Sequence, residues 1–587
     1  MCAEELIVLF HTLPFLVFML VVLPVFYALQ RTPLRIPWLL AASYFFYGWW
    51  NPYYLLLIAY STTLDYLLVA LMDHCPARGE RKAWERKTWE RQAPAWHKDP
   101  FSKEPGPGLD VPPASNAQAP REGPVLIAAE PRQSWSMALP GDRALRAAFG
   151  ISVLLAILLI GGAFAGPASF RPTCTLFALL VLLMAVGAWQ ASRRTWLLVS
   201  LVNNLALLLF FKYARFVISN LDQLLGWMGV SFRFPDPSAL VPHGFEYVLP
   251  VGISFFTFQS MSYTIDFYLG RVDRERNLLR FATFVCFFPQ LMAGPIERAR
   301  HMLPQFREPH PFRLQNLTDG LSQFLVGLFK KLALANYLSL YVERVYDNPG
   351  NFRSPDLMLA TFAFAWQIFF DFSGYTDMAR GLARMMGFNL ILNFNNPYLA
   401  TGLGDFWTRW HISLSTWFRD YVYIPLGGNR RGAWITYRNL LITFLVSGIW
   451  HGANWLFAIW GLIHGLGVIV TRALERSAFY RERVPKPVKQ AWVFLYVCFA
   501  WIFFRSRSLP DAWMIISRIF GSAWQSPEIP ALMLLLVGVV WLYQFIYESH
   551  LRPVLSSGAV RVTLAVGMML YLCLCSSGGG AFIYFQF

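Results

Sequence analysis

The chain alternates between long apolar segments and shorter polar connections. About 20 consecutive apolar residues make a helix that can cross the hydrocarbon core of a bilayer. The pattern therefore predicts an all-α, polytopic membrane protein with roughly 11–14 transmembrane and re-entrant helices. The predicted segments are residues 6–29, 36–50, 53–72, 147–165, 174–190, 196–217, 251–266, 281–295, 321–340, 357–370, 439–450, 456–471, 491–504, 530–546 and 562–587.

One long polar stretch interrupts this pattern. Residues 73–146 begin with a charged run between Arg78 and Arg91 and continue with many prolines. This composition predicts a short charged helix followed by a disordered linker, and basic residues close to a span end favour the cytoplasm. We divide the chain into N-terminal membrane helices (1–72), a polar, cytoplasmic loop (73–146) and a membrane core (147–587).

Several segments depart from a simple span. Residues 251–266 carry many hydroxyl and amide side chains, which predicts that one face meets protein or a wet cavity. Residues 281–295 are short and broken by proline, so we expect a re-entrant or interfacial segment. Residues 221–250 resemble a loop. The span at 357–370 is expected to end before Asp371 and Asp377.

The composition agrees with a membrane protein. Hydrophobic residues make up 56% of the chain and charged residues 14%, against about 25% charged residues in soluble domains. The net charge is +16, but most basic residues lie in short loops, as the positive-inside rule expects. No nucleic-acid-binding module is present. None of the seven cysteines has CxxC spacing, and we expect no metal site.

Two histidines, each flanked by tryptophan, stand out in this apolar background. Ionisable side chains in membrane segments are costly and mark candidate functional sites. His451 lies in Trp450–Trp455, a segment in which Gly452 permits close approach of another group. Asn454 is placed to donate hydrogen bonds to an oxyanion, and Ser447 lies one helical turn before the histidine. A neutral imidazole there suits a general base.

His411 belongs to a different pattern. Residues 407–418 have tryptophans at helical spacing, which predicts an amphipathic helix at the membrane interface. His464 lies about 220° further round an ideal helix than His451 and is expected to be a packed side chain in another place. A metal site made of the three histidines is disfavoured, because no carboxylate is adjacent.

Four arginines close to His411 in the sequence are candidates for binding the phosphates of a cofactor. They are Arg409, Arg419, Arg430 and Arg431.

These residues alone leave two classes of function open. A polar cavity that contains histidine suits acyl transfer, whereas the acids Asp266, Asp371 and Asp377 suit a proton-coupled transporter or flippase. Further candidates for supporting roles are Gln259, in the polar segment, and Trp455, beside the His451 loop. The residue pattern itself goes no further than a polytopic protein with a polar, histidine-bearing cavity.

The order of several motifs resembles the membrane-bound O-acyltransferase family, in particular its bacterial alginate O-acetyltransferase branch. The likeness covers nearly the whole chain except residues 73–146. The motifs are Gln259 to Asp266, Pro289 to Ile296, Asp371 to Asp377, Phe406 to Ser415, Arg419 to Asn429 and Trp450 to Trp455.

The resemblance implies a ring of tilted helices around a thin central funnel in the bacterial inner membrane. His451 matches the catalytic histidine of the family, acting as general base or transient acyl carrier. His411 matches a second position that orients or binds the thioester. The implied donor is cytoplasmic acetyl-CoA, with no bound cofactor. The implied acceptor is an exported polysaccharide such as alginate, reached with periplasmic acetyltransferase partners. Transfer of D-alanyl or another acyl group from a carrier protein is the alternative within this fold.

Overall fold

The computed structural model describes residues 10–75, 192–240, 247–523 and 530–575. Within these ranges all regular secondary structure is helical. The predicted spans 147–165 and 174–190, and nearly all of the polar stretch 73–146, lie outside the described residues. The three-part division of the chain therefore stays a prediction.

The chain separates into two compact units. The first contains Met1–Leu68, Ser200–Ile265 and Arg274–Phe587, and the second contains Val69–Val199 and Asp266–Asp273. Both candidate histidines and all the groups discussed around them belong to the first unit.

Seven helical runs in the described part of the chain are long and apolar enough to cross a membrane. This confirms a multi-pass, all-helical membrane protein; the larger helix count and the funnel arrangement stay predictions. The runs are α3 (Tyr54–His74), α7–η4–α8 (Arg193–Trp227, with α7 at Arg193–Leu208), α13–η6–α14 (Leu314–Tyr346, made of α13 at Leu314–Phe329, η6 at Lys330–Ala335 and α14 at Asn336–Tyr346), α15 (Ser354–Met385), α19 (Trp455–Leu474), α21 (Lys486–Arg505) and α23 (Ala531–Glu548).

The remaining helices are mostly shorter, although α18, with 19 residues, is as long as some of these runs. Two of them, α1 and most of α25, are apolar but shorter than a full span. The others connect or cap the long helices. Their bounds are α1 (Leu13–Ala28), α2 (Arg35–Gly48), α9 (Ile253–Tyr268), α10 (Leu278–Cys286), α11 (Phe288–Leu291), α12 (Ala299–Arg307), α16 (Leu403–Arg409), α17 (Ile412–Phe418), α18 (Ala433–His451), α20 (Ala478–Glu482), α22 (Leu509–Gly521), α24 (Arg552–Ser556) and α25 (Gly558–Cys575).

Helix α15 forms the centre of the first unit. It packs against α11, α13, α14, α21 and α22, and 83% of the residues in its most apolar 18-residue stretch are buried. The predicted end before Asp371 is wrong, because the helix continues unbroken to Met385. The acids are tolerated inside it since Lys331 pairs with Asp371 at 2.5 Å and Lys330 pairs with Asp377 at 2.7 Å.

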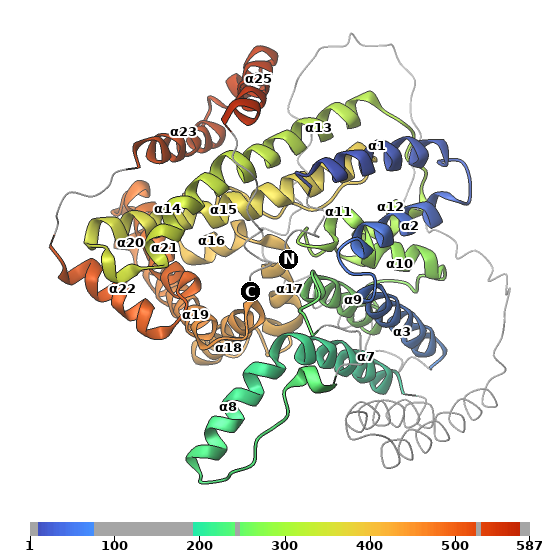
Figure 1. The fold of residues 1–587 in the computed structure, drawn as a ribbon, viewed down its shortest axis with the longest axis horizontal. Coiled ribbons are helices and arrows are strands. Elements are labelled where there is room, and N and C mark those ends of the chain that lie inside the picture. The colour runs from blue at the N-terminus through green and yellow to red at the C-terminus, as the bar shows by residue number, and fades with distance from the viewer. Residues whose placement is uncertain (1–9, 76–191, 241–246, 524–529, 576–587) are drawn as a thin grey trace. The chain divides into compact units, whose positions relative to one another are not determined.

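Small residues allow α13 and α15 to approach closely, and Figure 1 shows the two helices side by side. A Cβ added at Gly327 would lie 2.5 Å from the Gly374 carbonyl oxygen, and one added at Gly320 would lie 2.6 Å from the Gly381 carbonyl oxygen. Glycine pairs of this kind let helix backbones touch in membranes, where dispersion contacts drive association. The two glycine contacts therefore fix α15 against α13.

The sequence-based boundary after residue 217 is also wrong. The helix continues through a π-helical turn, η4 (Leu209–Tyr213), and through α8 (Ala214–Trp227). Leu221, Leu224 and Trp227 recur at three-residue spacing, which suits a helix better than the predicted loop.

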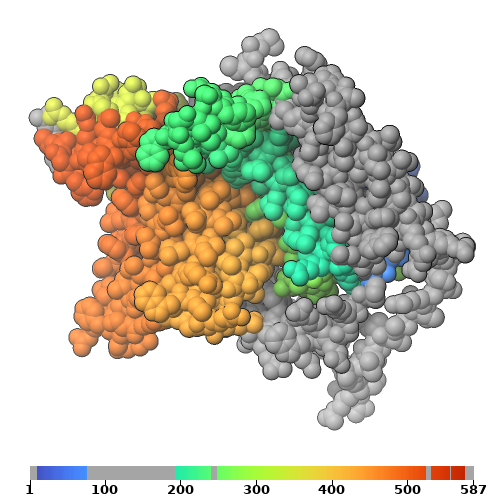
Figure 2. All heavy atoms as spheres, turned by 90° about the horizontal axis from the view of Figure 1, so that it is seen from below, coloured from blue at the N-terminus to red at the C-terminus, as the bar shows by residue number. Residues whose placement is uncertain are grey.

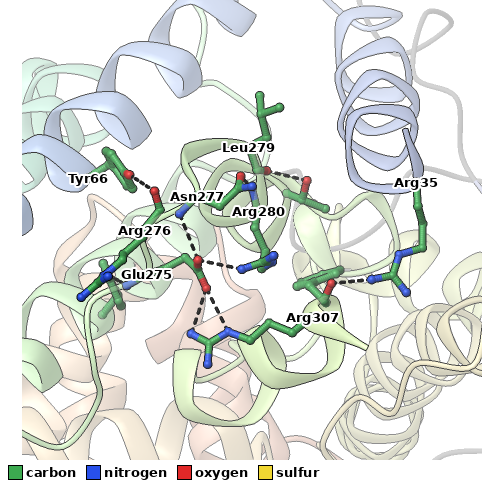
Figure 3. A network of polar contacts seen from close by, with 11 residues as sticks. Arg35, Tyr66, Glu275, Arg276, Asn277, Leu279, Arg280 and Arg307 are labelled. Carbon is green, nitrogen blue, oxygen red and sulfur yellow. Dashed lines mark hydrogen bonds and ion pairs between the residues drawn. The ribbon is translucent and has the colours of Figure 1, made fainter. Parts of the chain in front are cut away.

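A buried carboxylate organises the short segments that follow α9. Glu275 lies between two guanidinium groups, at 2.9 Å from Arg280 and 3.0 Å from Arg307, as Figure 3 shows. Arg35 from α2 donates to the Phe306 carbonyl at 2.8 Å. These contacts join α10 and α12 around one buried carboxylate. The nine-residue α10 and the four-residue α11 are each too short to span a membrane, as predicted.

Candidate functional site

His451 is the last residue of α18 and is 5% exposed. The helix stops there because Gly452 is extended, and the Asn454 side chain then caps α19 by accepting from the Leu456 amide at 3.0 Å. α18 and α19 pack against each other through glycine, since a Cβ at Gly448 would lie 2.2 Å from the Phe457 carbonyl oxygen. His451 thus lies at the closed end of a tight helical hairpin.

Lys212 holds this end of α18 in place. Its ammonium group donates to the carbonyl oxygens of Trp450 at 2.8 Å and His451 at 2.9 Å. These carbonyls have no partner within the helix, and a cation there also complements the helix dipole. The neighbouring Tyr213 hydroxyl donates to Ile449. In Figure 2 the green atoms of the segment that contains Lys212 and α8 lie beside the orange atoms of the α18–α19 hairpin, which they contact through Lys212 and Asn220.

Sequence reasoning missed Lys212 as a site residue. Its π-helical turn is a feature that is frequent at functional sites. The available signal was a lysine in an otherwise apolar run, which is a functional candidate by the same argument as the histidines.

Aromatic rings surround the His451 imidazole. The ring centroids of Trp450 and Trp460 both lie 5.0 Å from it, and that of Phe504 lies 5.5 Å from it. Trp450 also reaches His411, with ring centroids 6.3 Å apart. The structure therefore brings the two predicted histidines to one tryptophan.

The continuous interfacial helix predicted over residues 407–418 is wrong. The chain breaks into α16 and α17, and His411 between them has a left-handed backbone with φ of 43°. This conformation costs about 1–2 kcal/mol for an L-residue. Asn393 compensates by accepting from the Ile412 amide through its carbonyl and from the Ser413 amide, at 3.1 Å, through its side chain.

His411 is fully buried within the protein. Its ring contacts Phe372, at 4.7 Å between ring centroids, and Phe255, at 6.3 Å. The tryptophans of the motif turn inward for the same reason: Trp410 is 1% exposed and Trp417 is 4% exposed. The helical spacing of these residues reflects two short buried helices.

His464 is a packed side chain, as expected, but the single-helix calculation behind that expectation does not apply. His451 and His464 lie on different helices, α18 and α19, because the chain turns back at Gly452. Trp460 packs on both rings, at 5.0 Å from His451 and 4.8 Å from His464. In the part of the chain that is described, no cluster of three or more metal-binding side chains occurs.

The four candidate phosphate-binding arginines have different surroundings. Arg409 is bound by Asp405 at 2.8 Å and Glu548 at 2.7 Å. Arg419 binds Asp420 at 2.7 Å. Arg430 and Arg431 are exposed in the turn before α18. The exposed pair keeps its guanidinium groups at the surface, whereas Arg409 and Arg419 would have to exchange carboxylates for phosphates.

The five supporting candidates divide by position. Ser447 is buried one turn before His451, and Asn454 caps α19 beside it. Trp455 is 56% exposed and donates to Asn220 of α8. Gln259 donates to the Phe284 carbonyl at the end of α10, and Asp377 binds Lys330. Ser447, Asn454 and Trp455 therefore all lie within four residues of His451 along the chain, and Ser447 is the buried one of the three.

Two cavities lie along α15. The larger, of about 350 Å³, is lined by α14, α15, the start of α19 and the end of α21. It includes the ion pair of Lys331 with Asp371, and its Phe457 and Phe504 rings are 5.0 Å apart. The smaller, of about 130 Å³, is lined by Asn393 and Phe394 beside His411 and by the pair of Lys330 with Asp377.

Comparison with known proteins supports the family resemblance of the sequence motifs. The model of the membrane-bound O-acyltransferase family matches residues 245–509, which include both histidines, both cavity-lining ion pairs and Trp450. The "Probable alginate O-acetylase AlgI" of Pseudomonas putida is 40% identical over 348 residues, 59% of this chain and 69% of the relative. This chain belongs to the membrane-bound O-acyltransferase family.

Two further relatives of this family member are bacterial. The "Probable alginate O-acetylase AlgI" of Pseudomonas aeruginosa is 40% identical over 59% of this chain and 64% of its own length. The "Peptidoglycan O-acetyltransferase" of Helicobacter pylori is 36% identical over 57% of this chain and 66% of its own length. The matches thus span about two thirds of each relative.

Proposed function

We propose that this protein is a membrane O-acetyltransferase that moves an acetyl group from acetyl-CoA toward the hydroxyl groups of an exported polysaccharide such as alginate. The observation that supports it most is the place of His451. The imidazole lies at a fixed helix end, inside the family-matched region, and one aromatic ring away from a polar cavity. The relatives at 40% identity carry alginate O-acetylase names.

In the proposed reaction His451 is the general base. It takes the proton of the acceptor hydroxyl while the hydroxyl oxygen bonds to the acetyl carbon. The thioester C–S bond then breaks, and the proton passes from His451 to the departing sulfur. Lys212 is a positioning residue, because its two hydrogen bonds fix the His451 backbone. His411 contacts the same Trp450 ring and orients the thioester.

The proposed sides of the membrane follow from charge. Arg476, Arg481 and Arg483 lie between the end of α19 and the start of α21, and Arg472 and Lys486 lie in the adjoining turns of these two helices. Basic residues accumulate on the cytoplasmic side, so the opposite helix ends face the periplasm. His451, at the end of α18, and the cavity end of α21 belong to these opposite ends. Acetyl-CoA would arrive from the basic side, where the exposed Arg430 and Arg431 suit its phosphates.

The transporter alternative has less support. It needs carboxylates that exchange protons or ions, but Asp266, Asp371 and Asp377 each have a basic partner, namely Arg271, Lys331 and Lys330. The D-alanyl alternative keeps the same chemistry and changes the donor, from a free thioester to one on a carrier protein.

The experiment uses the full chain in lipid nanodiscs with acetyl-CoA labelled in the acetyl group. We expect release of free CoA thiol and transfer of label to an unacetylated mannuronate oligosaccharide. His451→Ala should lower the rate about 10²–10⁴-fold, the usual share of general-base catalysis. His550→Ala is the matched control, because His550 is an exposed histidine outside the site.

Each outcome separates the alternatives. Thiol release that is unaffected by His451→Ala would exclude the proposed role of this residue. Activity only with a D-alanyl-loaded carrier would favour the second donor. A folded wild-type protein that cleaves neither donor would leave the transporter as the better interpretation.

A further inference from the structure

Some of the polar side chains that line the larger cavity have atoms without a hydrogen-bond partner in the described part of the protein. Its volume of about 350 Å³ reaches the range of small-molecule sites, which begins near 300 Å³. Both long walls, α14 and α15, contribute polar side chains, and α19 and α21 close the ends. The main polar lining residues are Asn336, Glu343, Gln367, Asn454, Arg505 and Arg507.

Two buried amides in this lining have an unused hydrogen-bonding atom. Asn336 on α14 and Gln367 on α15 are each 6% exposed. The Asn336 Nδ2 donor and the Gln367 Oε1 acceptor have no hydrogen-bond partner. Buried polar atoms in native proteins are nearly always paired, so each exception calls for a partner. One donor and one acceptor match hydroxyl groups, which can both accept and donate.

The cavity is also next to the proposed base. Phe457 and Phe504 line it, and the Phe504 ring centroid lies 5.5 Å from that of His451. Phe457 packs on the backbone after His451, because a Cβ at Gly452 would lie 2.1 Å from its ring. A rotation of the Phe504 ring is the movement that would join the cavity to the imidazole.

The ends of the helices place the cavity mouth. Arg505 ends α21 and Arg507 follows it, at the end opposite Lys486, while Asn454 precedes α19 at the end opposite Arg472. Arginines are disfavoured on the periplasmic side by the positive-inside rule. Here both bind Asp347, at 3.6 Å and 2.8 Å. Cations retained against this rule at a cavity mouth are suited to an anionic ligand.

We propose that this cavity is the acceptor subsite and takes one uronate unit of a polysaccharide from the periplasmic side. Asn336 donates to one sugar hydroxyl, Gln367 accepts from another, and Arg505 and Arg507 attract the carboxylate. This inference rests on the proposed acetyl transfer, and the hydroxyl that loses its proton to His451 gains the acetyl carbon. The two arginines at the mouth favour an occupant with a carboxylate, which a uronate unit carries and a serine does not.

The test replaces each amide with an apolar side chain of similar size, Asn336→Leu and Gln367→Met, in the full chain in nanodiscs. The probe is an unacetylated mannuronate trisaccharide, and its Kd is measured by calorimetry. Each variant should raise the Kd about tenfold, as expected for about one lost hydrogen bond. The thermal unfolding midpoint should stay the same or rise, because no intramolecular partner of these atoms is lost.

Gln544→Met is the matched control. Gln544 is also buried, with an unpartnered Oε1, but it lines the smaller cavity. It should leave the Kd of the trisaccharide unchanged. The Kd of acetyl-CoA, measured by the same calorimetry, should equal the wild-type value in all three variants. A variant that binds acetyl-CoA normally but binds the trisaccharide weakly identifies a failure of this subsite, whereas a wild-type protein that binds both and transfers no acetyl identifies a failure of the proposed reaction.

Three results would overturn the subsite. One is a Kd that stays within twofold of the wild-type value in both variants. Another is a lowered unfolding midpoint, which would show that the amides serve the fold. The third is a wild-type protein that acetylates N-acetylserine amide but neither binds nor acetylates the trisaccharide, which would assign the cavity to a protein hydroxyl.

Discussion

His451 and His411 contact the same indole ring, yet their surroundings differ in nearly every other respect. His451 lies at a helix end, held through its backbone by Lys212, with a large polar cavity behind Phe504. His411 is completely buried on a left-handed backbone between two short helices, with only a small cavity behind Phe394. This difference in surroundings is consistent with the proposed division of roles, in which His451 reacts and His411 holds its neighbours in position.

The same contrast extends along α15. The ion pair of Lys331 with Asp371 belongs to the cavity near His451, and its side chains are 5% and 2% exposed. The pair of Lys330 with Asp377 belongs to the cavity near His411, with 23% and 19% exposure. The two Lys–Asp ion pairs lie about one and a half helical turns apart on α15 and differ in how far they are removed from water. They should therefore differ in how much they contribute to the free energy of unfolding.

The largest expected effect tests that difference. Asp371→Asn leaves the Lys331 ammonium buried without its counter-charge, which costs about 3–5 kcal/mol. Asp377→Asn, the matched change at the more exposed pair, should cost less than half as much because water screens the remaining Lys330. Thermal unfolding midpoints in one detergent measure both.

The double variant Lys331→Met with Asp371→Leu is the control for Asp371→Asn. It removes both charges and should recover most of the lost stability. Equal losses for Asp371→Asn and Asp377→Asn would erase the contrast between the two cavities. Unchanged stability with Asp371→Asn would favour a carboxylate that works without its basic partner, as the transporter alternative requires.

Removal of Lys212 tests how the His451 side is held. Lys212→Met leaves the Trp450 and His451 carbonyls without their charged donor, a loss of about 1.5–3 kcal/mol for hydrogen bonds to a charged group. Thiol release from acetyl-CoA should fall with it, because the imidazole position depends on these carbonyls. Lys212→Arg keeps the cation and should retain part of the rate. A full rate with Lys212→Met would show that α18 ends correctly without this residue.

A third change tests the space behind His451. Gly452→Ala places a Cβ 2.1 Å from the Phe457 ring, and overpacking of this kind costs about 1–3 kcal/mol. Gly404→Ala is the matched control, since nothing lies within 4 Å of a Cβ there; it should leave the unfolding midpoint unchanged or raise it, because alanine is more stable than glycine in a helix such as α16. Thiol release should fall for Gly452→Ala alone, and equal behaviour of both variants would remove Phe457 from the site.

The sequence predicted the parts of this site that depend on local pattern. Apolar runs indicated the long helices, and His451 stood out because a histidine in such a run is rare. Other features depend on distant partners. Lys212 meets residues 238 and 239 positions away, and the length of α15 depends on lysines from another helix that pair with its acids. No local periodicity contains these contacts.

The break at His411 shows the opposite error. Tryptophans at helical spacing over residues 407–418 indicated one interfacial helix, and the spacing is present in both short helices. The left-handed residue between them is stabilised by Asn393, 18 residues earlier in the chain. Histidine is among the residues that adopt this backbone more often than most, but the sequence alone does not show where it does so.

The smallest expected effect isolates that backbone. His411→Gly and His411→Ala both remove the imidazole, but only glycine adopts a φ of 43° without strain. The glycine variant should therefore be more stable than the alanine variant by about 1 kcal/mol, and His411→Asn should lie between them or match glycine. Ser415 in α17 is the control, because glycine in a helix is less stable than alanine by about 0.5–1 kcal/mol. Opposite signs at the two positions, measured as unfolding midpoints, would assign His411 a positioning role through its backbone. The same sign at both would mean that position 411 is helical and that the contrast between the two histidines lies in access alone.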